Sequence, residues 1–403
     1  MKGKGLGIIL AVALTVLLLV AACAPASPVV EKKVVEIGSI DSLTGPGSRA
    51  DQLCLLGEMD YVRYFNEEER IPGVITQIVW RDSARTPEKW ISAYEALKGR
   101  GIPVISSRES VSRGYMDRLE RDKMPLVSDN TNQEMVYPPG WYYFTCPTWA
   151  EQFAVVAEYI MESWQEERPP RLAFMLIDTS FGRQIEVTGT RYAQELGFEM
   201  LPLETVPFVP LDTTPQLLRV KERGADFVYI SGLIVTSGPI LRDAERLGLL
   251  DEIHFSGSKI SAGKALIEMA GVASEGYLFP LTRPSIFETE LRGIKLVRDV
   301  QMKYHGEVVE EEEYIGGWIP AAIICEAVRR AVENVGYENI DGAAVKEALD
   351  SIRDFDVDGL VTITYNPPDD HAGCREVAVY QIRGGEIVRV SDFQDAPMLV
   401  PEG

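Results

Sequence analysis

Two glycine-rich segments have a composition that could bind phosphate groups. The segment 45–50 matches the Gly-x-Gly-x-x-Gly/Ala pattern of dinucleotide-binding loops, but four residues separate its first glycine from the preceding strand-like run. The fingerprint needs a turn directly at the strand end. The segment 257–265 has glycines one residue too far apart for a phosphate loop, and Lys264 is followed by Ala265 instead of a hydroxyl residue that could bind magnesium. We therefore expect no cofactor.

Histidine and cysteine, which often act in catalysis or bind metals, are sparse. The histidines are His254, His305 and His371. Neither a Gly-x-Ser-x-Gly elbow nor a His-Glu-x-x-His motif occurs. Beyond the N-terminal region the cysteines are Cys54, Cys146, Cys325 and Cys374, without a Cys-x-x-Cys pair. They form one disulfide or remain buried thiols. The sequence therefore predicts neither a catalytic residue nor a metal site.

The N-terminus has the features of a secretory signal. Two lysines precede an apolar run over residues 6–22, and small residues lead into Cys23. The run is at the lower edge of the ~17–25 residues that a membrane-spanning helix needs. Because the cysteine at the cleavage position resembles a lipobox, we predict a lipoprotein signal peptide over residues 1–22, acylation of Cys23 and a tether over residues 23–33. The alternatives are a permanent membrane helix and a plain signal peptide.

With such a signal, the mature protein would be extracytoplasmic, either held by lipid at the outer face of the cell membrane or periplasmic. Its roughly 370 residues are more than a single hydrophobic core usually accommodates, and they are enough for two domains. The formal net charge of −21 and the isoelectric point near 4.7 exclude a nucleic-acid partner, which needs a basic surface.

Strand-like and helix-like segments alternate along most of the chain. Thr86 and Pro87 are typical of a helix cap and first helical position, and 148–151 has the form of a capping box. The alternation predicts parallel sheets covered by helices on both faces, in two similar lobes. The acidic run Glu310–Glu313 is interpreted as a solvated loop or helix end. Expected strands are 34–40, 74–80, 104–105, 126–127, 142–144, 172–177, 227–230, 253–255, 361–365, 377–382 and 387–390; expected helices are 57–70, 87–98, 148–160, 182–196, 215–223, 239–247, 288–304, 319–335 and 343–352.

Five segments carry a resemblance to a known family. They are Ile37–Pro46, Trp80–Ala84, Met124–Ser128, Asp226–Gly232 and Tyr314–Ala322. Through them the chain resembles the branched-chain amino-acid binding proteins that serve ABC importers. The resemblance implies an α/β, two-lobed type I periplasmic-binding-protein fold, each lobe a parallel sheet flanked by helices, with three crossover segments. It places the crossovers near 144–148, 278–282 and 370–376, and it assigns 34–147 plus 280–372 to lobe 1 and 148–279 plus 373–398 to lobe 2.

The resemblance also implies a binding protein and not an enzyme. A small-molecule ligand would lie between the lobes, outside the carboxyl ends of the strands, and hinge closure would trap it. The implied function is capture of a small organic solute outside the cytoplasm and its delivery to an ABC permease in the membrane. The alternative is a ligand-sensing receptor subunit of the same fold for a signalling partner.

Two strand-end loops of the first lobe, 107–112 and 128–132, match the loops with which the family binds its ligand. Hydroxyl and backbone N–H groups in such loops can bind a carboxylate without a full opposite charge. Ordinary polar turns are the alternative interpretation. The matching residues are Glu109, Ser110, Asn130, Thr131 and Asn132.

The second lobe departs from the family in its ligand contacts. Phe181 stands where the family usually has a tyrosine, so it offers a packing face without a hydroxyl. Leu233 follows a strand end and would line the same wall. Lys259 aligns with the acidic residue that binds the ligand's ammonium group. A cation there would cost several kcal/mol in a desolvated cleft, so an α-amino acid in the usual pose is not expected.

Our hypothesis is that Lys259 faces a carboxylate or another electron-rich group, while Phe181 stacks on an apolar body. Two alternatives involve the nearby acids. Glu109 and Asp129 could serve a cationic or amide ligand, or they could pair with Lys259 or Arg108 inside the cleft and leave a neutral ligand.

Overall fold

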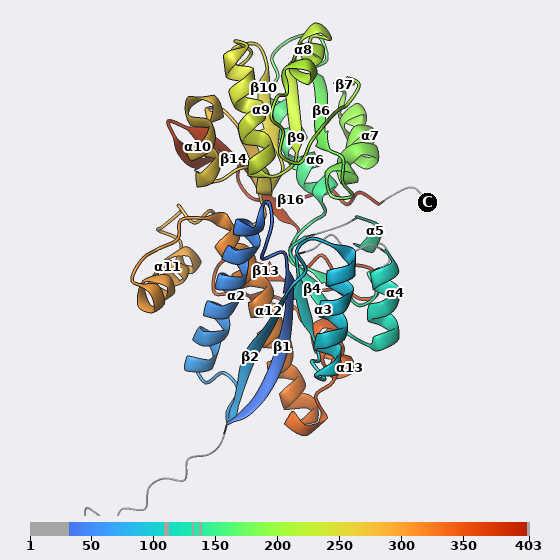
Figure 1. Cartoon of the computed structure of the whole chain (residues 1–403), viewed down its shortest axis with the longest axis vertical. Helices are drawn as coiled ribbons and strands as arrows, with labels where there is room; N and C mark the ends of the chain where they lie inside the picture. Colours follow the sequence, from blue (N-terminus) through green and yellow to red (C-terminus); the bar gives the residue numbers. More distant parts are fainter. Residues whose placement is uncertain (1–31, 109–112, 131–132, 137–138, 401–403) are drawn as a thin grey trace, which may run out of the picture.

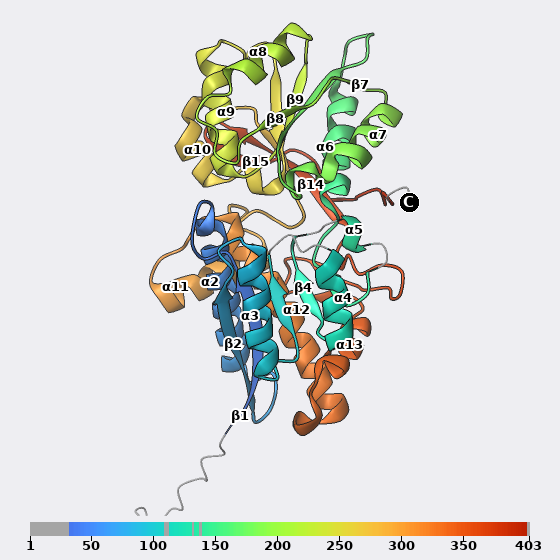
Figure 2. The ribbon, with the colours of Figure 1, turned by 45° about the vertical axis from the view of Figure 1, so that its right-hand side comes forward.

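The computed structural model describes residues 32–108, 113–130, 133–136 and 139–400. They form two lobes stacked along the long axis of the molecule (Figure 1, Figure 2). The predicted signal peptide, Cys23 and most of the predicted tether lie outside the described residues. Within the described part, no helix combines the length and the apolar composition that crossing a bilayer requires.

Lobe 1 is built on a sheet of five strands. Its strands are β1 (Lys33–Asp41), β2 (Val74–Asp82), β3 (Ile105–Ser107), β4 (Leu126–Ser128) and β5 (Tyr142–Phe144), and its helices are α2 (Ser48–Glu67), α3 (Pro87–Gly99), α4 (Arg113–Asp122), α5 (Gln133–Val136), α11 (Arg292–His305), α12 (Glu312–Val335) and α13 (Gly342–Asp350). The strands pair in parallel in the order β2-β1-β3-β4-β5. Neighbouring strand residues point to opposite faces: Val127 packs in the core that includes α2 and α12, and Leu126 in the core that includes α3.

Lobe 2 is built on a larger sheet. Its strands are β6 (Arg171–Ile177), β7 (Glu199–Met200), β8 (Glu204–Val206), β9 (Phe227–Ser231), β10 (His254–Gly257), β11 (Leu278–Leu281), β14 (Glu376–Arg383), β15 (Glu386–Arg389) and β16 (Gln394–Asp395); its helices are α6 (Trp149–Ser163), α7 (Glu186–Leu196), α8 (Thr214–Glu222), α9 (Ile234–Arg246) and α10 (Lys264–Ala270), with short 3-10 turns η1 (Gly182–Ile185) and η2 (Lys259–Ser261). The central order is β15-β14-β11-β10-β9-β6-β7.

The chain passes between the two sheets three times: after β5, after β11 and before β14. The expectation of a purely parallel sheet fails at one edge of lobe 2, where β14 pairs antiparallel with β11 and with β15. The reason is the connection. β11 ends where the chain leaves lobe 2 and β14 begins where it returns, so the two strands run in opposite directions without a crossover helix.

Capping signals positioned the starts of α3 and α6 correctly, whereas the helices expected over 57–70 and 319–335 begin earlier, at Ser48 and Glu312. The Thr86 side chain caps α3, and Thr148 forms the expected capping box with Glu151. The helix expected over 239–247 was wrong at its start, because α9 begins at Ile234 and contains Pro239. A proline inside a helix removes one backbone hydrogen bond, which α9 tolerates. The structure has buried free thiols and no disulfide among the four described cysteines, which are Cys54, Cys146, Cys325 and Cys374.

Helices α2 and α12 cross in backbone contact because glycines lie at their crossing. A Cβ atom at Gly57 would lie 2.0 Å from the carbonyl oxygen of Tyr314, and one at Gly317 would lie 1.8 Å from that of Cys54. Any larger residue would push the helices apart. This close approach brings Asp51 of α2 and Glu313 of α12 to the same cavity.

Candidate functional site

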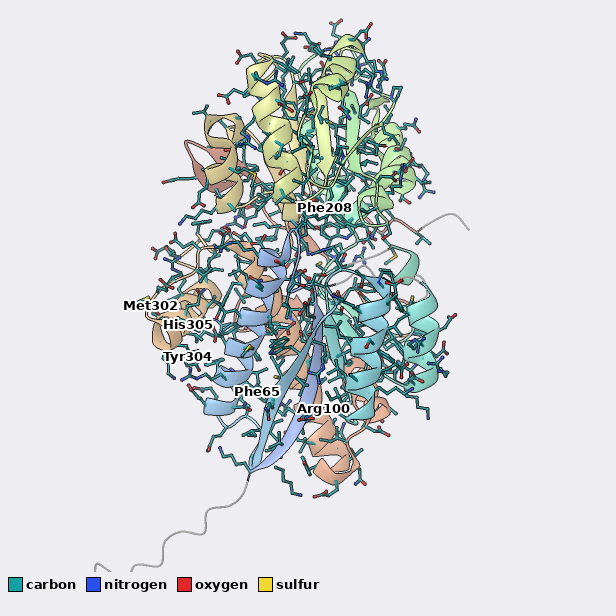
Figure 3. All side chains as sticks on the ribbon, in the orientation of Figure 1. Phe65, Arg100, Phe208, Met302, Tyr304 and His305 are labelled. Atoms are coloured by element: carbon teal, nitrogen blue, oxygen red, sulfur yellow. The ribbon has the colours of Figure 1, made fainter. Side chains whose placement is uncertain are left out.

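A cavity of about 680 Å³ lies between the lobes, within the range of roughly 300–1,000 Å³ typical of pockets for small organic ligands. It adjoins the strand ends of both sheets, where ligands of open α/β sheets bind. Phe208, in the loop between β8 and α8, lies at the boundary between the lobes (Figure 3). The apolar lining from lobe 2 includes Trp149, Ile177, Phe181, Phe208, Leu233, Ile234, Ile260 and Met269.

The lobe 1 wall is strongly charged. Arg108 follows β3 and Asp129 follows β4, so parallel neighbouring strands deliver both to the same sheet edge. The Arg108 guanidinium donates from Nη1 to Asp129 Oδ2 at 2.9 Å, and its Nε lies 3.4 Å from Asp51 Oδ1. The Arg108 backbone N–H donates to Asp41 Oδ1 at 3.2 Å. These bonds hold the first strand-end loop against α2.

Lys259 of lobe 2 reaches across to this charged wall. Its Nζ donates to the Asp129 carbonyl oxygen at 2.9 Å and to Cys146 Sγ at 3.2 Å, and it lies 3.7 Å from Asp129 Oδ2. The ammonium also lies 5.2 Å from the Trp149 ring centroid. Because an ammonium has three N–H donors, these contacts occupy Lys259 within the protein.

Asp129 is therefore the shared anion of a buried charge cluster. Its burial favours the neutral acid, but the nearby cations Arg108, Lys259 and Arg283 outweigh that effect and lower the pKa of Asp129. Of the alternatives raised by the sequence, the structure has the one in which Asp129 pairs with both Arg108 and Lys259.

The predicted site residues fall into two groups. Phe181, Leu233, Lys259 and Asn130 line the cavity, whereas Glu109, Ser110, Thr131 and Asn132 lie outside the described residues. Phe181 packs edge-to-face on Trp149 at 4.9 Å between ring centroids.

Asn130 uses its side chain within the protein. It donates to the Arg108 carbonyl oxygen at 2.8 Å and accepts from Trp149 Nε1 at 2.9 Å. Asn130 therefore ties the two strand-end loops of lobe 1 to the first residue of α6.

The acidic run Glu310–Glu313 lies at a helix end, as one of its two interpretations had it, but the expectation that it is solvated was wrong for Glu311–Glu313. Glu311, Glu312 and Glu313 are 7%, 4% and 8% exposed, because this segment at the start of α12 lies under lobe 2 and beside buried arginines. Burial raises the pKa of Glu313 and of Glu311, and it raises the pKa of Glu312 to about 7.

Sequence reasoning also missed lining residues outside the family's motifs. Arg85 is the third residue after β2, and the strand-end rule could have found it. The aromatic residues Trp90, Tyr115 and Phe208 carried no such signal. The charged residues of the described lining are Arg49, Arg85, Arg108, Lys259, Asp51, Asp129, Glu311 and Glu313. The lining therefore holds as many basic as acidic side chains, and burial raises the pKa of two of the acids, Glu311 and Glu313.

Comparisons with known proteins agree with this geometry. A family model described as periplasmic binding protein matches residues 34–386. The leucine-, isoleucine-, valine-, threonine- and alanine-binding protein of Pseudomonas aeruginosa is 20% identical over 320 residues, which are 78% of this chain and 82% of that protein.

Two solved structures superimpose on most of the chain. A branched-chain amino-acid ABC transporter protein from Thermus thermophilus with bound valine has a TM-score of 0.80 and 25% identity, covering 90% of this chain and 97% of that one. A fatty acid ABC transporter substrate-binding protein from Thermomonospora curvata has a TM-score of 0.80 at 17% identity, covering 92% and 95%; at that identity the likeness shows the fold alone.

The two-lobed type I fold and the family predicted from the sequence are thereby confirmed. Members of this family bind solutes and are not enzymes, and the family is extracytoplasmic. The chain belongs to the periplasmic binding protein family, as a solute-binding protein of the branched-chain amino-acid type for ABC transporters.

Proposed function

We propose that this protein captures a small organic solute with a large apolar body and a carboxylate or similar electron-rich group, and delivers it to an ABC importer. The observation that carries the proposal is Lys259. It stands where a binding protein for α-amino acids needs an acid, and its ammonium is bound by Asp129 and Cys146. An α-amino group placed there would meet a buried cation at high cost.

The apolar wall supports a large ligand body. Phe181, Trp149 and Phe208 present aromatic surface to one cavity, and aromatic side chains bury large apolar areas with defined stacking geometry. Arg49 and Arg85 of the opposite wall have side chains that are 72% and 38% exposed, and their guanidinium groups support an electron-rich group at the other end of the ligand. The relatives described above are transport proteins, which gives the sensor alternative no support.

Mass spectrometry of the purified protein under native conditions, followed by denaturation, tests the ligand class. We expect an apolar or aromatic carboxylate to be released intact. A competition series with carboxylates, their amides and free amino acids should rank carboxylates tightest, and binding should raise the melting temperature by mass action. If leucine or valine binds tightest, the ligand proposal is wrong although the family assignment stands.

We also propose that the protein is anchored through an acylated Cys23 after removal of residues 1–22. The support is the basic start, the apolar run and the small residues that precede the cysteine. We expect the N-terminal peptide of the membrane-bound protein to begin at Cys23 and to carry acyl chains, and Cys23→Ser to abolish this peptide. A peptide that begins at Met1 would indicate a membrane helix, and an unmodified peptide would indicate a plain signal.

A further inference from the structure

Arg85 is placed in the cavity by the loop that joins β2 to α3. Its Nη2 donates to Asp51 Oδ2 at 2.8 Å, and its guanidinium carbon lies 5.9 Å from the ring centroid of Phe208. Asp51 belongs to lobe 1 and Phe208 to lobe 2, so Arg85 lies where the lobes meet. The Arg85 side chain is 38% exposed.

The loop holds Arg85 in an unusual backbone conformation. Ala84 and Arg85 have φ values of 43° and 56°, and two successive non-glycine residues in this region are rare. Such conformations persist when the surroundings over-determine them, and they cluster at functional sites.

Side chains of the same loop supply that constraint. Asp82 Oδ1 accepts from the backbone N–H groups of Leu43 and Ala84 at 2.9 and 2.8 Å. Its Oδ2 accepts from the Thr44 hydroxyl at 2.7 Å. Ser83 Oγ accepts from the Arg85 backbone N–H at 3.3 Å. The loop is therefore built to fix the direction of Arg85.

Arg85 differs from the two more buried cations of the lining, and from Arg49, whose side chain is 72% exposed and whose Nη2 lies 3.6 Å from Glu311 Oε1. Arg108 is engaged by Asp51 and Asp129 and its side chain is 11% exposed, and Lys259 is held by Asp129 and Cys146. A guanidinium has five N–H donors, and within the described residues Asp51 takes one of those of Arg85. Its remaining donors form a planar fork of the kind that matches a carboxylate.

We propose that Arg85 binds the carboxylate of the ligand through its guanidinium fork, with the apolar body of the ligand against Phe208 and the lobe 2 wall. This inference rests on the proposed function and names the residue that sets its specificity. It also moves the anion site away from the two strand-end loops that the family resemblance implied. Arg85 of lobe 1 lies beside Phe208 of lobe 2. A ligand whose carboxylate binds Arg85 and whose apolar body packs on Phe208 would therefore contact both lobes and favour their closed arrangement.

The test compares Arg85→Gln with Arg81→Gln and wild type in the purified protein. Arg81 is a matched control near the end of β2, the strand that leads into the Arg85 loop, since its guanidinium donates to the Trp80 carbonyl oxygen at 2.8 Å and does not line the cavity. The probes are octanoate and 4-phenylbutyrate with their primary amides, titrated by calorimetry. Wild type and Arg81→Gln should bind a carboxylate more tightly than its amide. Arg85→Gln should weaken carboxylate binding about 10- to 100-fold, the loss of a charge-assisted hydrogen-bond pair, and leave amide binding unchanged.

The outcomes separate this inference from the proposed function. If Arg85→Gln keeps the carboxylate preference, the role of Arg85 is overturned and the ligand class stands. If wild type binds neither carboxylate, or binds the amides more tightly than the carboxylates, the inference that Arg85 binds a ligand carboxylate is overturned. If leucine or valine binds better than every probe, both fail. Arg85→Lys keeps the charge without the fork, and it should recover less than half of the lost binding free energy; full recovery would contradict bidentate binding.

Discussion

Replacing Asp129 by asparagine is expected to lower the free energy of unfolding by about 3–5 kcal/mol, the cost of removing one partner from a buried ion pair. The Asp129 carboxylate lies 2.9 Å from Arg108 Nη1 and 3.7 Å from Lys259 Nζ. Their side chains are 5%, 11% and 3% exposed. The amide would leave two buried cations facing each other. Urea denaturation of both proteins measures the difference.

The same substitution should also separate the lobes. Lys259 belongs to lobe 2 and Asp129 to lobe 1, so opening lets water solvate the unpaired ammonium and relieves part of the cost. We expect ligand-free Asp129→Asn to have a larger radius of gyration than wild type in small-angle X-ray scattering. Because opening relieves part of the destabilisation, a larger radius of gyration should accompany a smaller loss of unfolding free energy.

Asp356→Asn is the matched control for this prediction. Asp356 pairs with Arg292 on the surface of lobe 1, where the side chains are 51% and 70% exposed. Exposed pairs contribute about 0–1 kcal/mol. If Asp129→Asn matched wild type in both stability and radius of gyration, Asp129 would not hold the lobes together.

The parts of the fold that could be predicted from the sequence depend on signals within a single helix or strand. Short runs of strand-like composition located most of the strands, and the caps at Thr86 and Thr148 located helix starts because each cap bonds to backbone within its own first turn. The start of α9 was missed because Pro239 has the same local appearance inside a helix as at its beginning. The antiparallel edge of lobe 2 depends on where the chain re-enters that lobe, which no local pattern encodes.

The site was predictable only where it lies at strand ends. Lys259 and Leu233 follow strands of one sheet, and their place beside the cavity follows from that topology. Pairings across the lobes are different. Nothing in the sequence near Glu312 indicates that Ser285 and Ile286 bind it, and nothing near Asp129 indicates that Lys259 approaches it from 130 residues further along the chain.

Glu312 carries the second large prediction, a dependence of stability on pH. Burial raises its pKa from 4.5 to about 7 despite opposing contributions from Arg283 and Ser285. Its Oε1 accepts hydrogen bonds from the Ser285 hydroxyl and the Ile286 N–H, while Oε2 has no hydrogen-bond partner among the described residues. In the folded protein the proton therefore stays on Glu312 up to near neutral pH.

The sign of the effect follows from linkage. Between about pH 4.5 and 7 the folded state holds a proton on Glu312 that the unfolded chain has released, so stability falls as pH rises through this window and levels off above it. The full difference amounts to about 3 kcal/mol. Burial and the neighbouring Asp51 likewise raise the pKa of Asp41 to about 7, which adds a contribution of the same sign.

Glu312→Gln should remove the Glu312 share of this dependence, because the amide stays neutral at every pH and its oxygen can accept both hydrogen bonds. We expect the variant to lose less stability than wild type between pH 5 and 7.5, by roughly 2–3 kcal/mol, in urea denaturation series at each pH. Glu307→Gln, an exposed position of the same connection, should follow wild type. Parallel curves for Glu312→Gln and wild type would mean that Glu312 is already ionised in the folded protein, and that the start of α12 holds a buried negative charge against Arg283.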